Sequence, residues 1–199
     1  MEDMEQVVPE ETVDKNKVPR TILSYLHDLV FGLVVVLLVF MLVFRVIVVS
    51  GPSMMQTLQN GDCIVLLSST FSGAPKQGDI VVISKEAYKD GEPIIKRVIA
   101  TEGQEVSIAD GYVYVDGVRL DEPYTNTLTN YYAGIPFKQT VKEGCVFVMG
   151  DNRNQSKDSR SAEIGQIDCR EILGEALFIA FPGKDTTGER DFKRIGALW

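Results

Sequence analysis

Histidine is almost absent from this sequence. Of the 199 residues only His27 is a histidine, and it lies beside a long apolar stretch near the N-terminus. Histidine is the usual base that activates a serine or cysteine nucleophile, so a nucleophile elsewhere in the chain needs another base. One histidine and scattered cysteines also give no cluster of the ligands that zinc prefers. We therefore expect no metal ion and no cofactor.

Cysteine is also scarce. The 3 cysteines, Cys63, Cys145 and Cys169, are far apart and form no C-x-x-C pair. Their odd number leaves at least one thiol free or bonded between molecules. Cys63 and Cys145 lie in apolar, strand-like runs, which favours small buried hydrophobic residues over a reactive nucleophile.

Basic residues are outnumbered by acidic ones. The chain has 20 lysines and arginines against 28 aspartates and glutamates, a formal net charge of -8. A nucleic-acid partner calls for clustered positive charge, so we expect no nucleic acid to bind.

One long apolar run dominates the N-terminal part. Residues 29–44 contain no charged residue, and apolar residues extend the run over 22–47, past Arg45. A helix needs about 20 apolar residues to cross a bilayer. A buried core helix would show polar residues at helical spacing, and a cleaved secretory signal would be shorter with a small-x-small cleavage site. The run therefore predicts an uncleaved transmembrane helix over 22–47, with membrane lipid as a partner.

The flanking charges predict the orientation of this helix. Lys15, Lys17 and Arg20 precede it, whereas only Arg45 follows it closely. Positive residues prefer the cytoplasmic side. We expect a single-pass protein of the cell membrane, with residues 1–21 as a disordered, acidic cytoplasmic tail and the rest outside the cytoplasm.

After the apolar run the pattern changes to short strands. Asp110-Gly111 and Asp116-Gly117 separate apolar stretches and predict tight hairpins. The fold class is therefore mainly β: one transmembrane helix followed by an extracytoplasmic all-β domain over 48–183. A polar tail over 184–199 should be loosely held, although its end could pack back, and residues 124–139 form a long excursion. The strands are expected over 64–67, 80–83, 94–100, 106–109, 112–115, 146–149 and 172–181.

Ser53 is the candidate nucleophile, a few residues beyond the predicted helix. His27 lies on the other side of the bilayer, which leaves lysine, aspartate or glutamate as the base. Lys96 lies in an apolar strand, where burial would lower its pKa from about 10.4 towards 7–8 and supply a neutral amine. Taken alone, both residues have ordinary explanations: serine near glycine and proline forms turns, and a lysine in a strand often points to water.

A third segment, residues 150–160, is a dense polar loop directly after an apolar strand. Alone it is also typical of a solvated turn. The three segments together resemble the bacterial type I signal peptidases. Residues 50–58 are similar to the family's S-G-x-S-M-x-P-T-L motif with Gln56 in place of proline, and residues 96–100 to its K-R-x-x-G box with Ala100 in place of glycine. Residues 150–160 match G-D-N-R-x-x-S-x-D-S-R at every fixed position.

The resemblance implies a signal-peptidase-like fold and a role for each matching residue. Ser53 would attack the scissile peptide bond, with Lys96 as general base and Ser156 holding the lysine in place. Backbone N–H groups, including that of Ser53, would stabilise the oxyanion. The substrates would be secretory preproteins with small residues one and three positions before the cut. Asp158 and Arg160 would form a supporting ion pair, joined by Arg97. Met54 would contact the substrate.

Three other hypotheses were weighed. The penicillin-binding and β-lactamase group needs a lysine three residues after the serine, where this chain has Gln56. A soluble self-cleaving repressor-type protease would lack the anchor and the 150–160 box. A membrane-tethered binding domain without activity would not need Ser53, Lys96 and Ser156 together, but the sequence alone does not exclude it.

Overall fold

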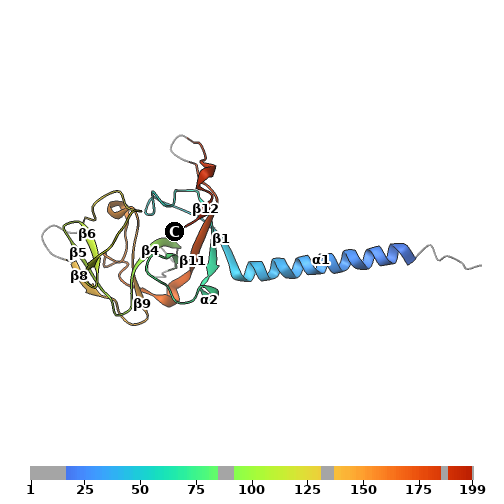
Figure 1. Ribbon diagram of the computed structural model, residues 1–199, viewed down its shortest axis with the longest axis horizontal. Helices are drawn as coiled ribbons and strands as arrows, with labels where there is room; N and C mark the ends of the chain where they lie inside the picture. The colour runs from blue at the N-terminus through green and yellow to red at the C-terminus, as the bar shows by residue number, and fades with distance from the viewer. Residues whose placement is uncertain (1–16, 85–91, 131–136, 185–187, 199) are drawn as a thin grey trace, which may run out of the picture. The chain divides into compact units, whose positions relative to one another are not determined.

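The computed structural model describes residues 17–84, 92–130, 137–184 and 188–198, in two compact units, Met1–Met41 and Leu42–Trp199. Helix α1, Lys17–Val43, contains a stretch over Ile22–Val43 that is long and apolar enough to cross a membrane. Residues 1–16 of the expected acidic tail lie outside the described residues, and residues 17–21, expected to be disordered, belong to α1. The remaining elements are mainly strands (Figure 1), as the sequence predicts.

The end of α1 corrects the predicted helix range of 22–47. The helix ends at Val43, and Phe44–Val48 form strand β1. This segment has β-branched residues at 46–49, which favour extended backbone. It pairs antiparallel with β2, Cys63–Ser68, over its whole length, and Ile47 packs against the core. The β domain therefore begins four residues before the predicted boundary at 48.

A large antiparallel sheet carries most of the β domain. Its strand order is β1-β2-β11-β3-β4-β9-β10, with β12 also paired to β11. Strand β1 is thus an edge strand. The helix α2, Ser69–Ser72, and the short helix η3, Cys169–Glu171, connect parts of this sheet. The other strands are β3 Ile80–Ile83, β4 Ile94–Thr101, β9 Cys145–Met149, β10 Ile167–Asp168, β11 Ile172–Phe181 and β12 Gly196–Ala197.

A smaller sheet follows β4 and has the order β7-β6-β5-β8. Its strands are β5 Glu105–Ala109, β6 Tyr112–Val115, β7 Val118–Arg119 and β8 Phe137–Thr140. Both predicted hairpins are confirmed. Ala109 pairs with Tyr112 and Val115 with Val118, and each two-residue turn has positive φ: Asp110 50°, Gly111 82°, Asp116 51° and Gly117 79°. Such turns need an Asp-Gly or Asn-Gly pair.

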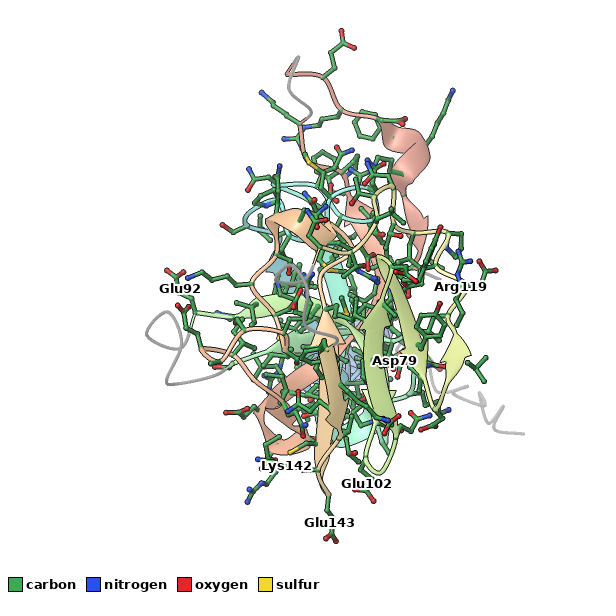
Figure 2. The ribbon with its side chains drawn as sticks, turned by 90° about the vertical axis from the view of Figure 1, so that its left-hand side faces the viewer. Asp79, Glu92, Glu102, Arg119, Lys142 and Glu143 are labelled. Atoms are coloured by element: carbon green, nitrogen blue, oxygen red, sulfur yellow. The ribbon has the colours of Figure 1, made fainter. Side chains whose placement is uncertain are left out.

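Among the described residues, the buried apolar side chains of the two sheets form three clusters. One cluster joins β4 and β9 of the large sheet to β5 and β6 of the small one, with Phe147 and Ile99 fully buried. A second cluster, between β2, β3 and β11, also contains Met54 and Leu58. At one end of the domain the turns carrying Glu102 and Lys142–Gly144 lie side by side (Figure 2), and the Gly144 N–H donates to the Glu102 carboxylate at 2.8 Å.

The C-terminal segment is held more firmly than predicted. Strand β12 pairs with β11, and the short helix η4, Phe192–Arg194, brings Arg194 to Asp62. The two Arg194 N–H groups donate to the two carboxylate oxygens at 2.8 and 2.7 Å, and the Asp62 side chain is fully buried. The expectation of a loose tail over 184–199 is therefore wrong for the described residues of that range, and the alternative that its end packs back is confirmed. The polar sequence of the tail did not indicate that Arg194 pairs with Asp62, which lies more than a hundred residues earlier in the chain.

Replacing Arg194 with methionine should destabilise the domain. Burial alone raises the pKa of Asp62, but hydrogen bonds from Arg194, Gly183 and Gln59 outweigh it and hold the pKa below its ordinary value of 3.8. Removing one partner of a buried ion pair costs about 3 kcal/mol of unfolding free energy. Urea unfolding followed by far-UV circular dichroism should show this loss in Arg194→Met.

The matched control is Arg170→Met, because Arg170 makes a similar two-bond pair with Asp168 on the exposed surface. It should change stability little. The Asp62 contribution is present above the carboxyl's unfolded pKa and is lost as pH falls through its lower folded pKa. The gap between wild type and Arg194→Met should therefore narrow below pH about 4. An equal loss in both variants, or a gap independent of pH, would contradict the buried ion pair.

Candidate active site

Ser53 lies in a compact turn that is held by backbone hydrogen bonds and by side chains buried in the core. The backbone N–H of Met55 donates to the Pro52 carbonyl at 3.0 Å, and that of Leu58 donates to the Met54 carbonyl at 2.8 Å. The Met54 and Leu58 side chains are buried in the cluster under β2, β3 and β11. The apolar residues after Ser53 therefore fix the turn and leave the serine at its surface.

Lys96 reaches the serine from the middle of β4. Its side chain is only 3% exposed, and its Nζ lies 2.8 Å from Ser53 Oγ and 2.9 Å from the Ile95 carbonyl oxygen. An amine held beside the hydroxyl at this distance can exchange a proton with it. The two residues are 43 apart in the sequence, and the strand brings them together.

The loop after β9 binds the backbone of the serine turn. Asn152 donates from its backbone N–H to the Ser53 carbonyl at 3.0 Å and from its side chain to the Pro52 carbonyl at 3.1 Å. Ser156, which the sequence assigned to Lys96, lies against Gly150 beside the Ser53 carbonyl, and its hydroxyl donates to the Lys157 carbonyl at 3.4 Å. The loop therefore joins the serine turn to β9.

Arg97 has a partner that the sequence reasoning missed. We expected it beside Asp158 and Arg160, but it pairs with Asp151, donating to both carboxylate oxygens at 2.9 and 2.8 Å. Both side chains are at most 3% exposed. The same carboxylate accepts from the Thr57 hydroxyl, four residues after Ser53. Because neighbouring side chains on a strand point to opposite faces, Lys96 faces the serine while Arg97 faces this carboxylate.

Asp158 and Arg160 form a separate ion pair. Arg160 donates to the two Asp158 oxygens at 2.8 Å each, and Asp158 also accepts from the backbone N–H of Gly150 at 3.1 Å. The Asp158 side chain is fully buried. This pair therefore holds the start and the end of the 150–160 loop together.

The sequence also did not indicate a second group of contacting side chains, which joins the 150–160 loop to the long segment after β7. Arg153 is buried and donates to both oxygens of Glu122, and the Tyr124 hydroxyl donates to the same carboxylate at 3.0 Å. The Tyr124 ring lies 4.0 Å from the Arg97 guanidinium carbon. Burial, followed by the Glu122 charge, raises the pKa of Tyr124, so the phenol stays neutral. No motif in the 120–125 segment predicted these contacts.

Gln56, which stands where the family motif has proline, has a backbone conformation that proline does not adopt. Gln56 has a φ of 93°, whereas the proline ring fixes φ near −65°. The chain therefore turns after Ser53 in a way that a proline at this position could not follow.

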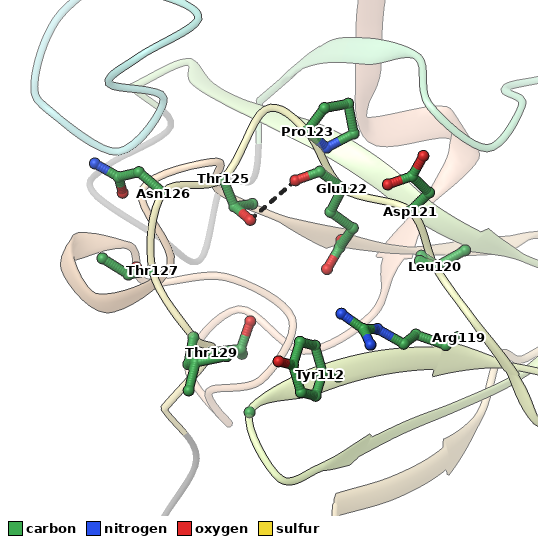
Figure 3. A pocket seen from close by; sticks show the side chains of 12 residues that line it. Tyr112, Arg119, Leu120, Asp121, Glu122, Pro123, Thr125, Asn126, Thr127 and Thr129 are labelled. Atoms are coloured by element: carbon green, nitrogen blue, oxygen red, sulfur yellow. Dashed lines mark hydrogen bonds between the residues drawn. The ribbon is translucent and has the colours of Figure 1, made fainter.

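Ser53 and Lys96 open onto a cavity of about 420 Å³. Ile47, Val49, Ile94 and Ile95 line one part of it, and Met54, the predicted substrate contact, contributes although most of its side chain belongs to the core. A different cavity of about 500 Å³ lies near β6 and β7, where Arg119 stacks on Tyr112 (Figure 3). That second cavity is lined by neither Ser53 nor Lys96.

A serine hydroxyl beside a buried amine, in a cavity on a β domain, is the arrangement of a serine hydrolase that works without histidine. The family model described as "Signal peptidase, peptidase S26" matches residues 22–181. The chain belongs to this signal peptidase family, and it is a serine protease.

Individual signal peptidases are similar to this chain in sequence over most of their length. Signal peptidase I of Bacillus licheniformis is 31% identical over 171 residues, which cover 82% of this chain and 90% of that protein. Signal peptidase I T of Bacillus subtilis is 33% identical over 178 residues, covering 83% and 89%. A crystal structure of a signal peptidase I from Enterococcus faecalis is 30% identical and covers 52% of this chain and 97% of its own, with a TM-score of 0.43.

Gly150 should not tolerate a side chain. An added Cβ would lie 2.5 Å from the Ser53 carbonyl oxygen and 2.6 Å from Ser156 Cβ, well inside van der Waals contact. Because displacing a catalytic group by about 1 Å costs about 100-fold in rate, Gly150→Ala should lose at least that much peptidase activity. The measurement is cleavage of a preprotein-derived peptide, with circular dichroism to verify folding.

Gly32→Ala is the control, because a Cβ at Gly32 meets nothing within 4 Å. Wild-type activity in Gly150→Ala would show that the loop and the serine turn are not held together as described.

Proposed function

We propose that the chain is a membrane-anchored endopeptidase that removes signal peptides from secreted preproteins, using Ser53 as nucleophile and Lys96 as general base. The observation that carries the proposal is the 2.8 Å contact between Lys96 Nζ and Ser53 Oγ within a cavity on the β domain. The family membership and the signal peptidase I relatives support the reaction class.

The mechanism follows from this contact. Burial of the Lys96 amine disfavours its charged form. The neutral amine accepts the Ser53 proton as Oγ bonds to the scissile carbonyl carbon, and the carbonyl oxygen becomes an oxyanion held by backbone N–H groups. The ammonium then protonates the leaving amine as the C–N bond breaks. Water, deprotonated by Lys96, then attacks the resulting ester. The Lys96 ammonium returns the proton to Ser53 Oγ as the ester C–O bond breaks, which releases the carboxylic acid product.

The cavity fits an extended substrate with small side chains. Strand β1 is an edge strand, so its outer side can pair with the backbone of a peptide. The apolar wall formed by Ile47, Val49, Ile94 and Ile95 suits short apolar side chains, such as alanine one and three residues before the cut. In this proposal Met54 forms the floor beneath the residue next to the cut.

Ser156, Asp158, Arg160 and Arg97 are assigned positioning roles. Ser156 lies against Gly150 beside the Ser53 carbonyl, from where it would hold the serine turn in place, while the two arginines hold the buried aspartates of the loop. None of the three charged residues needs to exchange a proton during the reaction.

The membrane arrangement is part of the proposal. Helix α1 would anchor the chain, with the basic residues at its N-terminal end in the cytoplasm and the β domain on the outer side. A site that begins ten residues after Val43 can meet preproteins where they emerge from the membrane.

Removing either member of the dyad should abolish cleavage. Ser53→Ala lacks the nucleophile and Lys96→Met lacks the base, so each should cleave a preprotein with an Ala-x-Ala site at least about 1,000-fold more slowly. The full-length protein in detergent, with product formation followed by mass spectrometry, provides the measurement. Lys138→Met, which removes an exposed lysine paired with Glu105, is the control. Normal turnover in Lys96→Met would rule out a lysine base.

Cleavage by the wild type should rise with pH. Only the neutral Lys96 amine can accept the Ser53 proton, and the fraction of neutral amine grows as pH increases. Initial rates at subsaturating peptide, measured from pH about 6 to about 10, should follow one ionisation. Circular dichroism at each pH excludes unfolding as the cause. A flat profile over this range would be incompatible with the proposed base.

A further inference from the structure

A second hollow adjoins the dyad cavity on the side of the 150–160 loop. It has a volume of about 450 Å³ and is lined by polar and charged residues, including Asn154, Arg160 and Glu163. Lys157 lines both this outer hollow and the cavity that holds Ser53 and Lys96. The two hollows therefore meet at Lys157.

The two ends of a bound peptide should see different surroundings. The signal-peptide end needs an apolar wall, which β1 and the start of β4 supply. Gln155 and Lys157 also line the dyad cavity, and Lys157 continues into the polar outer hollow. A peptide whose other end left Ser53 on this side would pass Lys157 with the first residues of the mature protein.

Lys157 is the exposed cation of this rim. Arg160 and Arg153 are tied to the buried carboxylates of Asp158 and Glu122. Lys157 instead pairs with Glu163 at 2.8 Å on the surface, with the two side chains 61% and 60% exposed. Such an exposed ion pair is weak, so an acidic group on a substrate can compete with Glu163.

We propose that Lys157 selects preproteins with an acidic residue in the first two positions after the cut, and disfavours lysine or arginine there. Glu163 lines only the outer hollow and Glu92 lines the dyad cavity together with Pro93 and Ile94, so Lys157 is the charged side chain that lines both hollows. The proposal rests on the proposed function, and it concerns which preproteins this site prefers. Lys157 occupies a position between Ser156 and Asp158 that the signal peptidase motif leaves open.

The test compares three peptides that are identical except for Glu, Gln or Lys at the first position after the cut. Full-length wild type in neutral detergent should give the highest kcat/KM with Glu and the lowest with Lys, each step being roughly two- to five-fold. The preference should shrink in about 1 M salt, because exposed charges are screened. Ratios between peptides cancel any effect of a variant on Lys96 itself.

Two variants should move the ratio in opposite directions. Lys157→Glu should reverse the preference, and Glu163→Gln should strengthen it by removing a carboxylate that competes with the substrate for Lys157. The matched control is Lys138→Glu, since Lys138 makes an equally exposed ion pair with Glu105 at 2.9 Å in the small sheet. It should leave the ratio unchanged.

The outcomes separate this proposal from the proposed function. Cleavage of the Gln peptide, with Glu and Lys peptides cut equally well by wild type and by Lys157→Glu, would overturn the role of Lys157 alone. A preference that follows charges placed before the cut would also overturn it. Failure to cleave any of the three peptides would count against the peptidase function itself.

Discussion

The buried ion pair between Arg97 and Asp151 is the constraint on which the site depends. It joins β4 to the loop after β9, and through Thr57 it reaches the serine turn. Neither charge has access to bulk water, so each needs the other to offset its lost hydration. Lys96 is the neighbour of Arg97 on β4 and points to the opposite face. Fixing Arg97 therefore also fixes the position from which the Lys96 amine meets Ser53.

Buried two-bond pairs of this kind recur among the described residues of the β domain: one joins Arg153 to Glu122, and three involve aspartates. Asp62, Asp151 and Asp158 are fully or almost fully buried, and each accepts two hydrogen bonds from one arginine. The Asp62 pair holds the end of the serine turn. The Asp151 and Asp158 pairs hold the 150–160 loop, which binds the start of that turn. Two-bond arginine–carboxylate pairs fix orientation as well as distance. The segments around Ser53 are irregular backbone without a ladder of their own, so side-chain pairs provide their rigidity.

Much of the fold followed from the sequence because its cues are local. Short apolar runs bounded by Gly-Asp pairs predicted the strands, and the Asp-Gly turns predicted both hairpins. The motifs also singled out Ser53 and Lys96, which the structure brings to 2.8 Å. The helix end at Val43 was missed because apolar β-branched residues continue past it and suit either a helix in lipid or a strand. Arg194, Glu122 and Tyr124 were missed because their partners lie far away in the chain.

The residues of the 150–160 loop fall into two groups: those that hold the loop in place and those that a substrate could contact. The fixed positions of the 150–160 segment are the ones that turn inward: Asp151 and Asp158 are buried, and Gly150 has no space for a side chain. The positions that the motif leaves open, such as Gln155 and Lys157, face the cavity or solvent. A change there alters the charge that a substrate meets while the ion pairs beneath remain intact. Under the proposed function, the loop would hold Ser53 and Lys96 in one geometry while its outer side chains would set the choice among preproteins.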